Sequence, residues 1–155
     1  MSDNPFDGPQ LQGEVFARAD MAAAEFRGVN LEGATFWAVL KGARFKDTNL
    51  AGATFNDVNL EGARLDDVNL TGATVENANL AQAKLRNVNL SEVSISSATL
   101  DGLGIEGVKA KDMVIRDADL SGARIEDCQL DGMTIDGVLV TEMLALWRRV
   151  RGSSA

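Results

Sequence analysis

The sequence predicts an all-β solenoid, in which short flat sides are joined by corners and the resulting coils stack along one axis. Three observations support this prediction. A large apolar residue returns at every fifth position through most of the chain, as in Leu50, Phe55, Leu60 and Leu65. A smaller apolar residue stands two positions before most of them, such as Ala53 before Phe55 and Val58 before Leu60. The two residues after each of them are mostly of types that favour turns.

The period of five fits no straight element. In a helix, five residues turn the chain through about 500°, so the large residues would scatter around its surface. In a straight strand, an odd spacing would place them alternately on the two faces. The chain must therefore turn a corner within each repeat if its large residues are to share one core.

Each repeat supplies one side and one corner. Ala63 and Leu65 lie two positions apart, and such residues point the same way in an extended chain, which leaves Arg64 outside. Two versions of the repeat also alternate, so that the residue pattern recurs every ten residues. This indicates an even number of sides per coil. Each buried large residue contributes roughly 1.5–3 kcal/mol before conformational entropy is subtracted. The predicted core columns include Leu50, Phe55, Leu60, Leu65, Leu70, Leu80 and Leu120.

The repeats resemble those of a known family. The segments ANLAQ at 78–82, VNLEG at 58–62 and ADLSG at 118–122 are similar to the signature of the pentapeptide repeat family, roughly Ala-(Asp/Asn)-Leu-x-x. The resemblance covers about residues 15–140. It implies a right-handed quadrilateral β-helix with four repeats in each coil, and hence about six coils over this length. It also implies that the recurrent Asn residues, such as Asn49, stabilise the stacking of the coils.

Four segments are expected from this pattern. We expect a flexible N-terminal leader over residues 1–10, the β-helix over 11–140, a short amphipathic helix over 141–151 and a disordered tail over 152–155. A coil stack ends in an apolar cross-section and unpaired backbone groups, which need a cover.

The C-terminal helix offers such a cover. Thr141 suits its N-cap, and Met143, Leu146, Trp147 and Val150 share one face at helical spacing. These side chains are predicted either to cap the end of the stack or to form the contact of a homodimer. The second interpretation draws on the resemblance, because pentapeptide repeat relatives often dimerise near the C-terminus.

The repeat slips once. Phe36 and Leu40 are only four positions apart, so one residue is missing around Trp37. This predicts a tighter corner there, with Trp37 protruding or packing over it.

Composition argues against catalysis. The chain has no histidine, which is the commonest general base and metal ligand, and it shows no phosphate-binding or nucleophile motif. Carboxylates such as Asp66 and Asp67 are expected at solvated corners, and Cys128 is expected as a buried filler in the core. We therefore predict a protein that is not an enzyme and that needs no metal or cofactor.

Composition also bears on location. The N-terminus lacks a signal peptide, and no segment approaches the ~20 apolar residues that span a bilayer. A single cysteine is typical of a reducing compartment. These observations predict a cytoplasmic protein that does not bind membranes, and the net charge of -8 argues against direct nucleic-acid binding.

Two functions remain open. The first is a structural or protein-interaction module with an unidentified partner. The second is implied by the resemblance: family members that confer quinolone resistance resemble duplex DNA in shape and charge and bind DNA gyrase, so the chain could protect or modulate that topoisomerase. The candidate partner-facing acidic side holds Asp57, Glu76, Asp117 and Asp136.

The charge pattern weakens the second function. Arg116 leaves the acidic side a net charge of -3, from four acids and one base. DNA of the same length, ~29 Å, would carry about 17 charges. The side that holds Leu65 mixes bases and acids, which predicts a ladder of compensating surface pairs. Its bases are Arg44, Lys46, Arg64, Lys84, Arg86 and Arg124.

Overall fold

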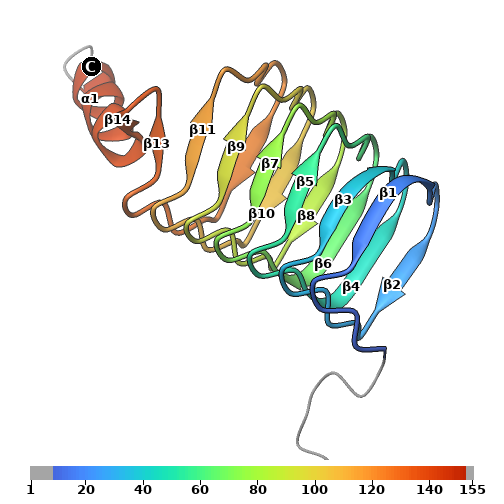
Figure 1. Cartoon of the computed structure of the whole chain (residues 1–155). Coiled ribbons are helices and arrows are strands. Elements are labelled where there is room, and N and C mark those ends of the chain that lie inside the picture. The colour runs from blue at the N-terminus through green and yellow to red at the C-terminus, as the bar shows by residue number, and fades with distance from the viewer. Residues whose placement is uncertain (1–8, 153–155) are drawn as a thin grey trace, which may run out of the picture.

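A computed structural model describes residues 9–152 as a β-solenoid of about six coils, followed by one short helix (Figure 1). This confirms the predicted fold class. The leader and tail predicted at the termini fall largely on residues 1–8 and 153–155, which lie outside the described residues. The strands are β1 (Val15–Asp20), β2 (Glu25–Arg27), β3 (Thr35–Val39), β4 (Arg44–Asn49), β5 (Thr54–Asn56), β6 (Arg64–Asn69), β7 (Thr74–Glu76), β8 (Lys84–Arg86), β9 (Ser94–Ser96), β10 (Gly104–Glu106), β11 (Val114–Arg116), β12 (Arg124–Glu126), β13 (Thr134–Ile135) and β14 (Val138–Leu139).

The strands form two sheets. The eight-stranded sheet has the order β1-β3-β5-β7-β9-β11-β13-β14, and the six-stranded sheet has the order β12-β10-β8-β6-β4-β2. Neighbouring strands are parallel and pair one coil apart, except for the antiparallel pair β13 and β14. The pairing keeps its register except for one shift between β1 and β3. Two further ladders of single bridges, such as Asn59 with Asn79 and Asn69 with Asn89, make the other two sides.

Two kinds of corner explain the ten-residue alternation. After Leu60, a turn places Gly62 at a φ of 65°, and the amide of Ala63 donates to the carbonyl of Leu60 at 2.9 Å. Only glycine adopts this backbone region without strain, as a type II turn requires. After Leu65, a single residue, Asp67, turns the chain at a φ of 55°. Aspartate and asparagine tolerate this left-handed conformation better than other side chains do.

The large residues of the repeat point into the solenoid and form its core. Among the predicted core residues, the structure buries Leu50, Phe55, Leu60, Leu65, Leu70 and Leu80. Leu120 is only partly buried, as are Ile125 and Leu130 nearby. Its prediction as a core residue is therefore only partly right, because no further complete coil of the described residues stacks beyond this end.

Aromatic rings fill the N-terminal part of the core. Phe36 stacks between Phe16 and Phe55, with ring centroids 5.0 and 4.8 Å apart. Phe26 stacks on Phe45 at 4.6 Å, with the ring planes 5° from parallel. The parallel register of successive coils places identical side chains directly above one another, which favours these stacks.

Asparagine side chains link successive coils. Asn49 Nδ2 donates to Asn30 Oδ1 at 3.2 Å, and Asn69 Nδ2 donates to Asn49 Oδ1 at 3.1 Å. The same Oδ1 of Asn49 also accepts from the amide of Ala51 at 3.2 Å. Asn59 makes only the second kind of bond, to the amide of Glu61 at 3.0 Å. Both side chains thus shape their corners, and Asn49 also joins three coils.

We expect Asn49→Ala to lower the free energy of unfolding by about 1–3 kcal/mol, because it removes bonds to two neighbouring coils and one corner bond. Asn59→Ala is the matched control, and it should cost about 1 kcal/mol because it removes the corner bond alone. Urea unfolding followed by circular dichroism measures both. Equal losses would show that the bonds between coils contribute nothing.

The slip near Trp37 removes a corner. Strand β3 runs straight through the position, and no described residue between Gly33 and Gly42 has a positive φ. The neighbouring strand β1 compensates by leaving Arg18 out of the pairing. The prediction of a tighter corner is therefore wrong, because the missing residue is the corner residue itself.

A hairpin and a helix end the described chain. Asp136 and Gly137 have φ values of 50° and 78°, as in the type I′ turn of a two-residue hairpin, and β14 folds back on β13. Helix α1 (Val140–Gly152) begins one residue before the predicted helix and ends one residue after it. No helix among the described residues has the length and apolar composition needed to cross a lipid bilayer.

Candidate interaction surfaces

The four predicted acids do not form one continuous row. Asp57 and Asp117 occupy corners, Glu76 ends β7, and Asp136 lies in the turn of the hairpin. In the column of Glu76, the next two coils carry Ser96 and then an arginine. All four acids are exposed. Asp57 and Glu76 lie close together in adjacent coils, because the amide of Asp57 donates to the carbonyl oxygen of Glu76 at 3.2 Å, but residues of other kinds follow in the next coils. The predicted acidic side is therefore interrupted and not continuous.

The apolar face of α1 is exposed. Met143, Leu146, Trp147 and Val150 are 37%, 53%, 55% and 61% accessible, and Val140 is the one buried residue among those described in the helix. Figure 1 shows α1 beyond β14, away from the body of the coils. The predicted cap is therefore not formed by these side chains in the single chain, and the homodimer contact stays a prediction.

Trp37 lies on the outside of the eight-stranded sheet. The guanidinium of Arg18 stacks over its ring at 5.1 Å from the centroid, which is a cation–π distance. A shallow hollow of about 230 Å³ adjoins the pair, and Asp20 and Asp57 also line it. Because β3 runs straight through the slip, it carries an aromatic ring on the outside of the sheet. An ordinary repeat has a polar residue there.

The six-stranded sheet carries fewer ion pairs than predicted. Arg86 Nη2 lies 2.7 Å from Asp66 Oδ2, and Arg124 Nη2 lies 2.7 Å from Glu126 Oε1. The hydrogen bond from Arg86 lowers the pKa of Asp66 below its ordinary value, so this carboxylate stays ionised in more acidic solution. The predicted ladder of compensating pairs is therefore confirmed for only two of its six bases, Arg86 and Arg124. The other four, which make no ion pair with a described residue, are Arg44, Lys46, Arg64 and Lys84.

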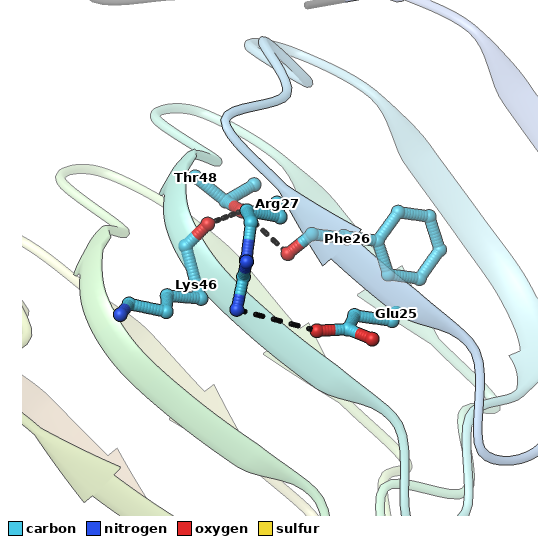
Figure 2. A network of polar contacts seen from close by, with 5 residues as sticks. All are labelled: Glu25, Phe26, Arg27, Lys46 and Thr48. Carbon is cyan, nitrogen blue, oxygen red and sulfur yellow. Dashed lines mark hydrogen bonds and ion pairs between the residues drawn. The ribbon is translucent and has the colours of Figure 1, made fainter.

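Three of these bases form a row that we call the basic row: Arg44, Arg64 and Lys84. They pair in register on β4, β6 and β8, and their side chains are exposed. Figure 2 shows the N-terminal end of this sheet, where Arg27 turns to Glu25 on its own strand and the side chain of Lys46 reaches outward. In the same view, the hydroxyl of Thr48 lies within hydrogen-bond distance of two backbone carbonyl oxygens of this sheet.

A hollow of about 720 Å³ lies over this sheet, and Arg64 and Lys84 of the basic row line it. The next residue in the column is Gly104, which pairs with Lys84 on one side and Arg124 on the other. Because Gly104 has no side chain, the outer surface of the sheet is hollowed at that point. A Cβ there would meet only the carbonyl oxygen of Ala83, 4.0 Å away, so the space is open to a side chain or to a ligand.

Residues with catalytic or metal-binding potential are dispersed. Among residues 9–152, no three His, Cys, Asp or Glu side chains gather in a way that could hold a metal ion. Cys128 is partly buried, and its Sγ lies 2.9 Å from the carbonyl oxygen of Glu126. The prediction that Cys128 is a buried filler of the core is therefore only partly right.

Comparisons with solved structures find other proteins of similar repeats. A pentapeptide repeat protein from the thylakoid lumen of Arabidopsis thaliana is 30% identical, with a TM-score of 0.48, over 62% of this chain and 65% of that chain. The match thus spans less than two thirds of that protein. HetL, a pentapeptide repeat protein involved in heterocyst differentiation regulation in the cyanobacterium Nostoc, is 18% identical, with a TM-score of 0.32, over 84% of this chain and 91% of that chain.

A third similar structure is QnrB1, a plasmid-mediated fluoroquinolone resistance protein. It is 21% identical, with a TM-score of 0.37, over 97% of this chain and 92% of that chain. No curated protein sequence matches the chain.

Family profiles match most of the sequence. The pentapeptide repeat region matches residues 38–115, and the pentapeptide repeats in eight copies match residues 6–37. Together they cover most of the corners, core columns and asparagine ladders described above. The chain therefore belongs to the pentapeptide repeat family.

Proposed function

We propose that the protein is a non-catalytic module that binds other proteins through its exposed surfaces. The observation that carries this proposal is the apolar face of α1, where four large side chains lie open to solvent. Contiguous exposed apolar patches on a folded protein mark interaction sites, since water contact with such side chains is unfavourable.

A second copy of the chain is the partner that we propose for this face. A two-fold interface joins the same patch on both copies, so each helix would cover the other. Trp147 is the natural centre of such a contact, because tryptophan and arginine dominate the binding energy of many interfaces. Arg151 lies over the Trp147 ring at 4.8 Å and completes this pairing of residue types.

Affinity purification tests the broader proposal. The immobilised wild-type protein should retain a partner from native lysate, and the purified partner should bind with a fixed stoichiometry in isothermal titration calorimetry. The variant Trp147→Arg, which places a charge in the apolar face, should lose partners held by α1. Ala145→Arg places the same charge on the opposite face of the helix and serves as its matched control. If the column retains only further copies of the chain, the proposal of a different partner protein is contradicted.

DNA gyrase is the second candidate partner. The net charge of -8 and the exposure of Asp57, Glu76, Asp117 and Asp136 favour it, while their separation into corners, strand and hairpin disfavours a continuous mimic of DNA. If gyrase is a partner, the purified protein at micromolar concentration should inhibit supercoiling or restore it in the presence of a quinolone. Unchanged supercoiling under both conditions would contradict this candidate.

A further inference from the structure

We propose that the basic row and the adjoining hollow bind an extended acidic segment of a partner protein. The inference deepens the proposed role as an interaction module and rests on it, but it concerns the six-stranded sheet and not α1. It assigns a surface and a partner chemistry: carboxylate side chains that face Arg44, Arg64 and Lys84, with the backbone of the segment passing over Gly104.

The first step is the isolation of the charges in the row. Their parallel register places successive Cα atoms about 4.8 Å apart. Like charges directly opposite one another destabilise a sheet. Among the outward columns of the described residues, only this one carries like charges in three successive coils. No described carboxylate forms an ion pair with these three bases, so an anionic partner would relieve the repulsion.

The second step is the sign of the surrounding surface. The outward residues of the six strands hold seven bases and six acids, a net charge of +1, in a chain whose net charge is -8. The bases are Arg27, Arg44, Lys46, Arg64, Lys84, Arg86 and Arg124, and the acids are Glu25, Asp47, Asp66, Asp67, Glu106 and Glu126. The sheet is thus slightly positive on an acidic protein, and the bases of the row, which form no ion pair with a described residue, attract an anion locally.

The third step separates a protein segment from a nucleic acid. Tight binding to a phosphate backbone needs many neutralised phosphates, whereas this row spans only about 10 Å. The lining of the hollow also includes Glu106 and Glu126, beside Arg124, and these carboxylates repel phosphates. The same carboxylates accept hydrogen bonds from the amides or basic side chains of a peptide. A lining of mixed charge therefore fits a polypeptide better than a polyanion.

The fourth step concerns the shape of the occupant. No outward column of the described residues carries acids in three successive coils, so a second copy offers no matching row. In an extended peptide, alternate side chains lie about 6.8 Å apart on one face. The coils are only about 4.8 Å apart, so the two spacings do not match. The long, flexible side chains of arginine and lysine can reach across this mismatch.

Fluorescence anisotropy with a short labelled peptide of alternating Glu and Ser tests the inference at low salt. The double variant Arg64→Gln/Lys84→Gln should weaken binding about tenfold or more, because it removes two unpaired charges from the row. The matched control Lys109→Gln/Arg116→Gln removes two exposed charges from other sides, and it should bind almost as well as the wild type.

Gly104→Val tests the hollow without changing charge. Gly104 does not have a positive φ, so a β-branched residue fits its strand. We expect this variant to retain its circular dichroism spectrum and to lose most of its affinity for the peptide. Unchanged affinity would overturn the part of the inference that places the segment over Gly104.

A single-stranded oligodeoxythymidine with the same number of charges as the peptide is the competing probe. The inference fails if this probe binds as tightly as the peptide and with the same dependence on Arg64 and Lys84. It also fails if the peptide does not bind, or if the control double variant loses as much affinity. The Trp147→Arg variant changes α1 and leaves this sheet unchanged, so it should bind the peptide like the wild type. A failure of the proposed helix contact can therefore be distinguished from a failure of the basic row.

Discussion

Replacing Phe36 with alanine is expected to lower the free energy of unfolding by about 3–5 kcal/mol. The ring is completely buried, and it stacks on an aromatic ring in the coil on either side, at centroid distances of 5.0 and 4.8 Å. Removal of the ring leaves a cavity between three coils, and close-packed neighbours refill such a space only in part. The lost stacking adds to the cost.

Phe16→Ala is the matched control for this substitution. Phe16 belongs to the same column, but it is only partly buried and stacks on Phe36 alone. Because each coil touches only its neighbours, a loss at the end of the stack affects one interface and a loss inside it affects two. Urea unfolding of both variants, followed by circular dichroism, should show a clearly smaller loss for Phe16→Ala. Equal losses would contradict the nearest-neighbour description.

The core could be predicted because every repeat has the same geometry. Leu65 and Leu85 occupy equivalent positions in successive coils, and they pair in register as their spacing requires. The period of five thus indicated both the fold and the direction of each side chain. The end of the stack could not be predicted in this way, since the burial of Leu120 depends on whether another coil covers it.

The hairpin shows where the local signal was ambiguous. Asp136-Gly137 is a strong hairpin dipeptide, but Asp101-Gly102 and Asp131-Gly132 have the same letters and form ordinary corners of the solenoid. The difference lies in the segment after the dipeptide, because β14 pairs back on β13 where the helix interrupts the next coil. A dipeptide alone does not carry that information.

The surface charges were the least predictable part. The sequence showed that bases and acids are mixed on the side of Leu65, and pairing was the simplest expectation. Pairing instead depends on which side chains reach one another. Arg86 reaches back one coil to Asp66, and Arg64 and Lys84 then form no ion pair with a described residue. The basic row could be recognised only from the register together with the side-chain directions.

Replacing Trp147 with arginine is expected to convert a homodimer into a monomer. In the proposed two-fold contact, Trp147 of one copy lies close to the same face of the other, so the substitution removes apolar area and brings two like charges together. Sedimentation equilibrium at tens of micromolar should give the wild type twice the 16.5 kDa of one chain and the variant that mass once. Because Trp147 is largely exposed in the single chain, the variant should fold normally.

Ala145→Arg separates the loss of the contact from the mere addition of charge. Ala145 is exposed and lies about 200° around the helix from Met143, on the opposite side from the apolar face. This variant should therefore remain a dimer with the mass of the wild type. A wild-type monomer at these concentrations, or a dimer that Trp147→Arg leaves intact, would show that the apolar face of α1 serves another partner or none.

The remaining outcome, a dimer lost in both variants, would point to a general sensitivity of α1 to added positive charge. Such sensitivity is physically reasonable, since Arg148, Arg149 and Arg151 already crowd the last turns of the helix. It would also contradict the proposed contact, because Ala145 lies outside the face that the contact uses. Only a loss confined to Trp147→Arg assigns the dimer to the apolar face.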